Sequence, residues 1–196
     1  GRHHRLRRLS DDRTHRRDCR GPRAVPLARE RPAGPRHCTA CGSLLEERKI
    51  EGRKRALCVR CGAIAYENPL PVAAAVVTNE RGEVLLVRRA RHPLKGMWCL
   101  PCGFAEKDEQ IEEAALRELE EETHLRGRVV RLLDAVTARN HFYGNLVMIT
   151  FEIGGVTGAP KPGDDAAEVR FFPPDRIPSL AFPCQERAIQ RCRSRA

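Results

Sequence analysis

The sequence lacks any long apolar run, and aromatic residues make up only 5% of its 196 residues. A membrane-spanning helix needs about 18 or more consecutive apolar residues, and no such stretch occurs, so we expect no membrane partner. The length fits one medium domain and a small accessory module, since single domains commonly hold about 100–200 residues.

The apolar core of a signal peptide is also missing. Nine cysteines are present, but four of them form two C-x2-C pairs that are each followed by Gly, which is more typical of a reducing compartment than of a secreted disulfide framework. We therefore expect a cytoplasmic protein. Because the chain begins with Gly1 rather than Met, a targeting signal at an altered or missing natural start, and hence an organelle, stays open.

Most of the net charge of +10 lies in the first 36 residues, which hold 12 Arg, no Lys and four acidic residues. The other 160 residues hold 24 basic and 22 acidic side chains, so the remainder is nearly neutral and nucleic acid is not the expected partner. Residues 1–36 interleave Arg with Pro, Gly and His without periodicity, which predicts a disordered basic tail. A solvated or non-native extension is the simplest interpretation. A nucleic-acid or membrane-binding arm and a degraded organelle-targeting peptide are the alternatives.

Two C-x2-C pairs within residues 37–68 predict a structural zinc site. Cys38 and Cys41 are separated from Cys58 and Cys61 by 16 residues, and a Gly follows each pair. Zinc takes four tetrahedral ligands, and such turns direct backbone N–H groups at the sulfurs. About 30 residues cannot build a stable core alone, so the metal would supply the stability. Two disulfides or a catalytic metal are the alternatives, although four thiolates leave no coordination position open for water.

A third pair, Cys99 and Cys102, has the spacing of a thioredoxin-like motif. A redox dithiol needs its first Cys at a helix N-terminus, whereas Gly103 and Phe104 follow this pair and the next helix is expected near Glu109. We therefore predict a packing or loop role for both cysteines.

Residues 69–196 are expected to form an α/β domain. Apolar runs at 72–78 and 83–88 flank turn-type residues, which predicts a hairpin. Residues 109–123 contain neither Gly nor Pro and are rich in strong helix formers, which predicts a helix. Three further strands and a C-terminal helix are expected at 129–136, 146–153, 169–172 and 185–193. Mixed strands and helices indicate a layered α/β fold.

Three carboxylates share one face of the predicted helix 109–123. At about 100° per residue, Glu118, Glu121 and Glu122 lie on the side of the apolar stripe, whereas an ordinary amphipathic helix turns its acids away from that stripe. Converging carboxylates raise one another's pKa unless a cation lies between them. Carboxylate oxygens suit Mg²⁺ or Mn²⁺. The alternative, for the helix taken alone, is a solvated Glu-rich face.

The loop before this helix fits the same interpretation. Arg117 and Glu109 are two turns apart, so an ion pair between them could fix the loop to the helix, and Gly103 permits a close backbone approach. The whole stretch resembles the Nudix box, G-x5-E-x7-R-E-U-x-E-E-x-G-U, in which U is a bulky aliphatic residue. Eight of the nine specified positions match, namely Gly103, Glu109, Arg117, Glu118, Leu119, Glu121, Glu122 and Leu125. His124 stands where the family has Gly, and Cys102 stands where a second upstream Gly is usual.

Residues 37–190 are similar to zinc-ribbon Nudix hydrolases, notably plant plastid enzymes that split FAD. NADH pyrophosphatases share this architecture, but their Ser-Gln-Pro-Trp-Pro-Phe-Pro array is absent here. The resemblance implies a Nudix α/β/α sandwich with a mixed sheet, preceded by a small zinc ribbon. It also implies Mg²⁺-dependent cleavage of the pyrophosphate bond in a nucleoside diphosphate derivative. FAD or ADP-ribose is favoured as the substrate, NADH is the alternative, and the products would be two monophosphates.

The resemblance places two or three Mg²⁺ ions on Glu118, Glu121 and Glu122. In some relatives the base lies outside the box, so Asp165 or Glu168 could supply an extra base or ligand, with loop closure as the alternative role. Four candidates for contacts with the substrate are Arg88, Arg89, Phe142 and Tyr143. The arginines could instead be solvated, and the aromatic rings could simply pack.

A second class of function stays open. In it, the domain senses a nucleotide and the zinc ribbon contacts nucleic acid or a protein. His124 and Cys102 favour it, because both alter loops beside the predicted metals. The sequence does not decide whether the protein forms a homodimer.

Overall fold

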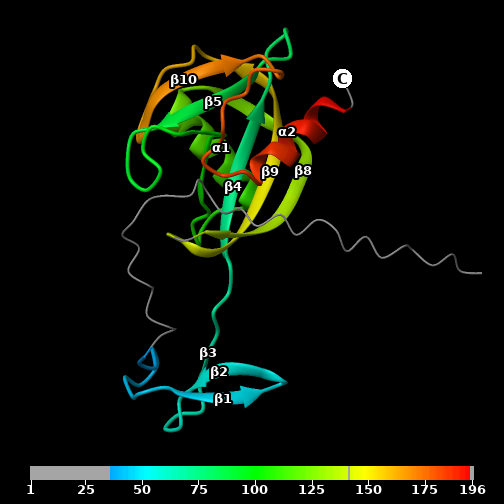
Figure 1. Ribbon diagram of the computed structural model, residues 1–196. Coiled ribbons are helices and arrows are strands. Elements are labelled where there is room, and N and C mark those ends of the chain that lie inside the picture. Colours follow the sequence, from blue (N-terminus) through cyan, green and yellow to red (C-terminus); the bar gives the residue numbers. More distant parts are fainter. Residues whose placement is uncertain (1–35, 141, 195–196) are drawn as a thin grey trace, which may run out of the picture.

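The computed structural model describes residues 36–140 and 142–194. The predicted tail, apart from Arg36, therefore lies outside the described residues. Figure 1 shows a small N-terminal sheet and a larger α/β body joined by an extended segment. Within the described ranges, no helix is long and apolar enough to cross a membrane.

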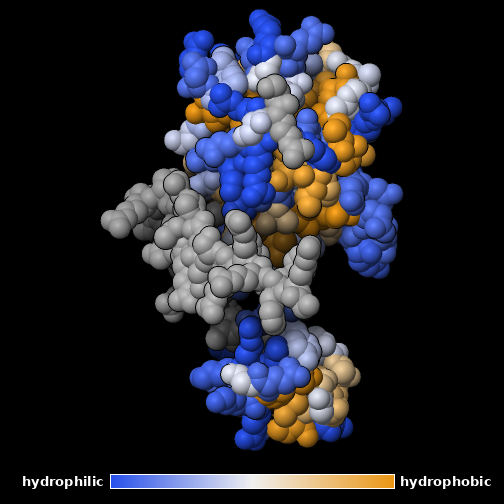
Figure 2. All heavy atoms as spheres, turned by 90° about the vertical axis from the view of Figure 1, so that its right-hand side faces the viewer, coloured by the Kyte–Doolittle hydropathy of each residue, from blue (hydrophilic) through white to orange (hydrophobic). Residues whose placement is uncertain are grey.

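The small N-terminal sheet has three antiparallel strands, β1 (Glu46–Ile50), β2 (Arg53–Leu57) and β3 (Ile64–Ala65). Among residues 36–69 only Cys38 and Cys58 are buried. Hydrophobic surface shows on this body in Figure 2, and its exposed apolar side chains include Leu44, Val59 and Tyr66. An apolar core therefore does not account for the stability of this body.

The larger body contains two sheets and two helices. The four-stranded sheet has the order β7-β4-β9-β8, and the three-stranded sheet has the order β10-β5-β6. Strands β4 and β9 are parallel and the other pairs are antiparallel, so the four-stranded sheet is mixed. The strands are β4 (Leu70–Val77), β5 (Val84–Arg89), β6 (Trp98–Cys99), β7 (Cys102–Phe104), β8 (Arg126–Asn140), β9 (Gly144–Thr157) and β10 (Ala166–Phe172).

Strand β4 lies at the centre of the core, and its side chains alternate between two faces. Ala75 and Val77 pack with helix α1 (Ile111–Thr123) on one face. Val76 packs with helix α2 (Gln185–Arg193) on the other face. The two helices therefore cover opposite sides of the sheet, which confirms the predicted α/β/α sandwich with a mixed sheet.

The predicted hairpin at residues 72–88 is wrong beyond its turn. The turn forms, because the N–H of Asn79 donates to the carbonyl of Glu83 at 3.1 Å. Only a single bridge, between Thr78 and Val84, connects the flanking strands. Each strand is already paired on both edges, β4 by β7 and β9, and β5 by β10 and β6. Apolar runs around a turn identify two buried strands without identifying their partners.

Candidate active site

Helix α1 turns its carboxylates toward the interior to different degrees. It begins after Gln110, whose N–H donates to Glu113 Oε2 at 2.8 Å, and it buries Ala114, Ala115 and Leu119 against the sheet. Glu122 lies on this buried side and is only 3% exposed. The side chain of Glu118 is 13% exposed and that of Glu121 is 47% exposed. The three carboxylates thus run from the core to the surface along one face.

Arg117 ties the loop before α1 to the helix. Its Nε and Nη2 donate to Glu109 at 3.0 and 2.7 Å, and Nη2 also donates to the carbonyl of Phe104 at 3.1 Å. This guanidinium lowers the pKa of Glu109 to about 2. Its Nη1 donates to Glu118 at 2.7 Å and to Glu121 at 3.0 Å. One side chain therefore holds the loop and gathers two of the three carboxylates.

Gly103 of strand β7 lies in close contact with the Glu118 side chain of helix α1. A Cβ atom at this position would lie 2.1 Å from Glu118 Oε1, far inside van der Waals contact. Any larger residue would therefore push the Glu118 carboxylate out of its place. Strand β7 fixes Gly103 by pairing it with Ala73 of β4.

Glu122 is a buried acid in a crowded acidic environment. Its Oε2 accepts a hydrogen bond from the N–H of Cys102 at 3.1 Å. Burial, together with the nearby Cys102, Asp165 and Glu118, raises the pKa of Glu122 to about 10. Burial also raises the pKa of Glu118, against the opposing effect of Arg117. Glu118 and Glu122 are poorly solvated, line the same cavity and repel each other. Such a pair suits a hard divalent cation, which would remove the cost of that repulsion.

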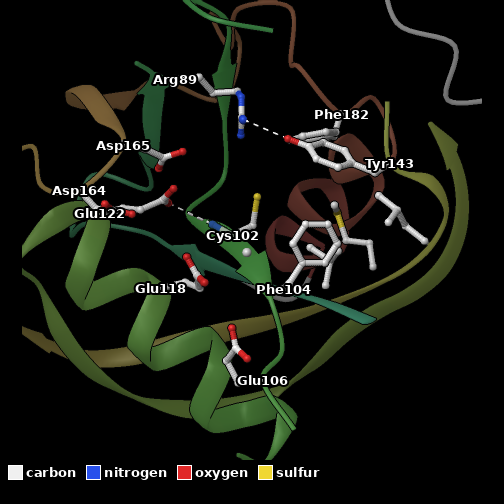
Figure 3. Close-up of a pocket in the computed structure, with 14 residues that line it drawn as sticks. Arg89, Cys102, Phe104, Glu106, Glu118, Glu122, Tyr143, Asp164, Asp165 and Phe182 are labelled. Atoms are coloured by element: carbon white, nitrogen blue, oxygen red, sulfur yellow. Dashed lines mark hydrogen bonds between the residues drawn. The ribbon is translucent and has the colours of Figure 1, made fainter. Parts of the chain in front are cut away.

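These carboxylates border a cavity of about 270 Å³. Figure 3 shows Glu118, Glu122 and Asp165 on one side and aromatic side chains on the other. The lining residues are Val72, Arg89, Cys102, Gly103, Phe104, Glu106, Glu118, Glu122, Tyr143, Leu146, Met148, Asp164, Asp165 and Phe182. The cavity thus has an acidic end, suited to metal ions and phosphates, and a largely apolar end.

Arg89 lies among the aromatic rings at the apolar end. Its Nη2 donates to the hydroxyl of Tyr143 at 3.5 Å, and its guanidinium carbon lies 5.6 Å from the centroid of the Phe182 ring. Phe104 meets Tyr143 edge to face, with ring centroids 5.5 Å apart. Arg89 Nε donates to the carbonyl of Pro93 at 3.0 Å. These contacts hold the Arg89 guanidinium and three aromatic rings around the apolar end of the cavity.

The predicted candidates divide between the cavity and the outside. Arg89, Tyr143 and Asp165 line it. Arg88 instead donates to the carbonyl of Gly96 at 3.0 Å and pairs with Glu168 at 3.5 Å. Neighbouring residues of a strand point to opposite faces, so the two arginines cannot both face the cavity. Three other candidates lie outside the cavity lining, namely Glu121, Glu168 and Phe142.

Phe104, Phe182 and Asp164 were missed as cavity residues from the sequence. Phe182 lies within residues 37–190, over which the resemblance to zinc-ribbon Nudix hydrolases extends, and Phe104 directly follows Gly103 of the box. Both positions could have been found there. Asp164 gave no such signal, because its place depends on how the loop before β10 folds.

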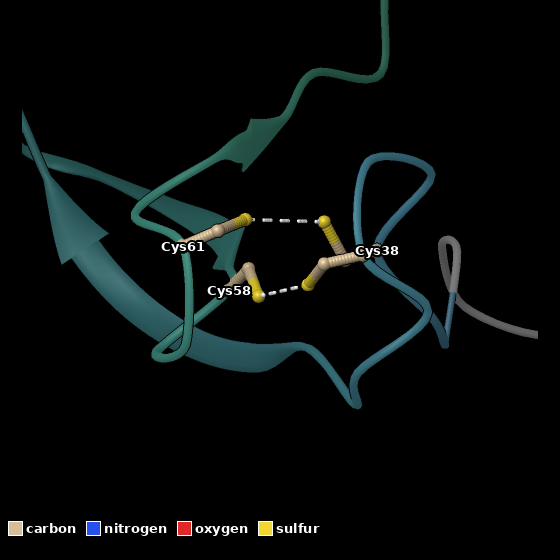
Figure 4. A group of neighbouring side chains, drawn as sticks. Cys38, Cys58 and Cys61 are labelled. Carbon is tan, nitrogen blue, oxygen red and sulfur yellow. Dashed lines mark hydrogen bonds between the residues drawn. The ribbon is translucent and has the colours of Figure 1, made fainter.

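Four cysteines of the N-terminal body converge, as Figure 4 shows. Their sulfur atoms all lie within 4.8 Å of one another, with Cys38 and Cys61 3.6 Å apart and Cys41 and Cys58 3.4 Å apart. The two pairs form equivalent turns, since the N–H after each pair donates to the carbonyl of its first cysteine at 2.8 Å. Four thiols at this spacing fit a tetrahedral zinc ion.

The other C-x2-C pair is buried in the larger body. Cys99 and Cys102 are 0% and 8% exposed. Gln185 Nε2 donates to Cys102 Sγ at 3.4 Å. A hydrogen bond with Cys99, together with burial, raises the pKa of the Cys102 thiol, which disfavours the reactive thiolate.

Comparison with known proteins agrees with this geometry. Residues 68–192 match the family model of the NUDIX domain. The chain belongs to the NUDIX family. It is 38% identical over 112 residues to the ADP-ribose pyrophosphatase of Methanocaldococcus jannaschii, covering 57% of this chain and 66% of the relative. It is also 29% identical over 147 residues to the NAD-capped RNA hydrolase NudC of Pseudomonas aeruginosa, covering 74% of this chain and 51% of the relative. The chain therefore spans roughly half to two thirds of these curated relatives.

The fold of the NUDIX domain is similar to solved structures as well. The crystal structure of a NUDIX hydrolase from Nitrosomonas europaea aligns with a TM-score of 0.65 and 29% identity, over 80% of this chain and 91% of that one. The α/β/α sandwich and its loop-helix element are thus those of the family.

Proposed function

We propose that this protein hydrolyses the pyrophosphate bond of a nucleoside diphosphate derivative with the help of Mg²⁺ or Mn²⁺. The observation that supports this most directly is a single cavity with carboxylates of the NUDIX helix at one end and Arg89 with aromatic rings at the other. A nucleoside diphosphate derivative matches both ends, because its phosphates suit metal ions on the carboxylates and its planar base suits the aromatic rings. The named activities of the relatives, on ADP-ribose and on NAD-capped RNA, support the same reaction class.

Glu118, Glu121 and Glu122 are the proposed metal ligands. Bound divalent ions would neutralise phosphate charge and lower the pKa of a water molecule. Arg117 orients the carboxylates of Glu118 and Glu121, because its Nη1 donates to them at 2.7 and 3.0 Å. The N–H of Cys102 holds the Oε2 atom of Glu122 in place.

Asp165 is the proposed proton acceptor. It lines the cavity and interacts closely enough with Glu122 to raise its pKa. A carboxylate there could take the proton of the attacking water, which is a general-base role. Glu168 is less suited to this role, because it pairs with Arg88 on the outside.

The aromatic end of the cavity is the proposed nucleoside site. Phe104, Tyr143 and Phe182 offer ring faces and edges to a planar base. Arg89 offers charged donors that suit phosphate oxygens. Its contacts with Tyr143 and Phe182 keep the guanidinium at the cavity wall.

ADP-ribose is the substrate we place first. The cavity of about 270 Å³ is slightly smaller than the roughly 300–1,000 Å³ typical of ligand sites, which favours a compact nucleotide over the larger FAD. FAD remains a candidate through the resemblance to plastid enzymes, and NADH through the similarity to the NudC relative.

The four-cysteine cluster is the proposed site of one structural Zn²⁺. A backbone hydrogen bond with Ser43, with further contacts, lowers the pKa of Cys41 to about 6, whereas the neighbouring thiols raise the pKa of Cys61 against a backbone hydrogen bond with Ala63. Cys41 is therefore the thiol of the cluster that ionises first. The scarcity of buried residues in this body gives the metal a structural role. We propose no catalytic role for it, because four thiolates complete the tetrahedron.

Nucleotide sensing without turnover is the second candidate. It is favoured by Cys102 and His124, two departures from the family pattern beside the carboxylates. The purified chain, incubated with Mg²⁺ and ADP-ribose, FAD, NADH, nucleoside triphosphates or NAD-capped RNA, separates the two candidates. Mass spectrometry should find AMP and ribose 5-phosphate from ADP-ribose, and EDTA should abolish both products. Tight ADP-ribose binding with no product from any substrate would support sensing instead.

A further inference from the structure

The loop between β9 and β10 crosses the C-terminal end of helix α1. The N–H of Lys161 donates to the carbonyl of Thr123 at 3.0 Å, and the N–H of Gly163 donates to the carbonyl of Glu122 at 3.1 Å. The last four carbonyls of a helix have no partner within the helix, so this loop satisfies two of them. The loop then continues directly into Asp164 and Asp165, which line the cavity.

His124 ends the helix in a conformation that usually belongs to glycine. Its φ and ψ are 58° and 16°, in the left-handed region, and its N–H donates to the carbonyl of Glu120 at 2.8 Å. Glycine adopts this conformation without steric cost, whereas a residue with a Cβ does not. A side chain at this position therefore works against the stability of the helix end.

The imidazole of His124 contacts the crossing loop. Its Nδ1 lies 3.1 Å from the carbonyl oxygen of Lys161. A carbonyl only accepts, so Nδ1 carries the hydrogen and donates it. A Cβ atom on Gly163 would lie 2.6 Å from His124 Cε1 and 2.3 Å from the Glu121 carbonyl. The loop thus passes in close contact with both the ring and the helix backbone.

The far end of the loop is fixed as well. The N–H of Ala90 donates to the carbonyl of Asp165 at 2.7 Å, at the end of β5. Asp164 has a φ of 41°, which is also left-handed. The loop 161–165 is therefore short and is held by His124 at one end and by Ala90 at the other, so a shift at His124 would move the two aspartates.

We propose that His124 is a positioning residue that sets the Asp165 carboxylate against Glu118 and Glu122. This inference rests on the proposed function, in which Asp165 accepts a proton. The imidazole gives the loop a side-chain hydrogen bond that glycine cannot provide, and the strained helix end is the cost.

His124→Gly and His124→Asn test this role because they separate stability from positioning. Glycine removes both the strain and the hydrogen bond. Asparagine tolerates the left-handed region, and its side-chain N–H can replace Nδ1. We expect Tm of His124→Gly to be unchanged or higher. We expect its kcat on ADP-ribose to fall about fivefold to fiftyfold with little change in KM, since misplacement by about 1 Å can cost about 10²-fold. His124→Asn should stay within about twofold of the wild-type kcat.

A double-mutant cycle with Asp165→Asn shows whether the effect acts through Asp165. If it does, His124→Gly should cost little kcat in the Asp165→Asn background. Full turnover of His124→Gly, or an equal loss in both backgrounds, would overturn the inference while leaving the hydrolase assignment intact.

Hydrogen exchange provides a measurement that does not depend on activity. The amides of Lys161 and Gly163 should exchange faster in His124→Gly than in the wild type and should be protected again in His124→Asn. Identical exchange in all three proteins would also overturn the positioning role, whether or not the wild type hydrolyses ADP-ribose. A wild type without turnover would contradict the proposed function separately.

Discussion

Glu122 and Cys102 are joined by a hydrogen bond of 3.1 Å from the backbone N–H of Cys102 to the carboxylate oxygen Oε2. The bond connects the end of helix α1 to strand β7, so the buried acid has a fixed place in the core. Because the donor is a backbone N–H, the hydrogen bond does not require the side chain of Cys102. This explains how the chain keeps the carboxylate oriented although Cys102 stands where the family has a second Gly.

The pKa of Glu122 predicts how the metal-free protein responds to pH. Its folded-state pKa, about 10, is above the ordinary value of about 4.5, so the folded protein prefers the protonated acid. The stabilising contribution of protonated Glu122 is then fully present below about pH 4.5 and is lost as the pH rises toward 10. Glu122→Gln removes this titration while keeping an acceptor for Cys102. In EDTA at pH 8 its Tm should exceed that of the wild type by several degrees, an advantage that disappears at pH 5.

Differential scanning calorimetry from pH 5 to 9 measures this difference, and saturating Mg²⁺ should reduce it by stabilising the wild type alone. Equal Tm values for the two proteins at every pH would mean that Glu122 is solvated or already neutralised by a group of the protein.

Arg89 and Arg88 form a matched pair for the substrate site. Arg89 lines the cavity, whereas Arg88 turns outward to Gly96 and Glu168. Hydrogen bonds to charged groups contribute about 1.5–3 kcal/mol, so Arg89→Ala should lower kcat/KM for ADP-ribose by at least about tenfold. Arg88→Ala should change it by less than about twofold. Steady-state kinetics on both variants would contradict the orientation of β5 if the two losses were equal or reversed.

The four-cysteine site predicts about one zinc ion per chain, because four thiolates complete one tetrahedral site. Cys58→Ser removes a buried ligand and should reduce zinc content, measured by plasma mass spectrometry, to near zero. Cys184→Ser, outside the cluster, is the control and should retain the metal. A fully folded N-terminal body without zinc in the wild type would contradict the assignment.

Those parts of the site that lie close together in the sequence could be predicted from it. The cysteine spacing and the loop and helix around Arg117 are local patterns, and helix periodicity places Glu122 on the buried side. The edges of the cavity could not be predicted in the same way. Phe104, Tyr143 and Phe182 come from three separate segments, and only the fold brings them together.

The strands were predicted in part, for identifiable physical reasons. Strands β8 and β9 extend well beyond the apolar runs at 129–136 and 146–153, because the pairing continues through polar and glycine residues. Bulges between Val129 and Arg131 and between Leu132 and Asp134 also break the alternation on which prediction depends. Strands β6 and β7 contain two and three residues, too few to show periodicity.

The central claim is that Glu118, Glu121 and Glu122, which run from the core to the surface along one face of α1, hold catalytic divalent ions. The most direct test is kcat for ADP-ribose with Mg²⁺ in Glu122→Gln and Glu121→Gln, compared with Glu120→Gln. Glu120 lies on the same helix but binds Arg126 on the outside at 2.7 Å. At about 1.36 kcal/mol per tenfold in rate, losing a metal ligand should lower kcat by at least about 10³ in the first two variants. Glu120→Gln should stay within about threefold. Normal turnover in all three variants would contradict the claim.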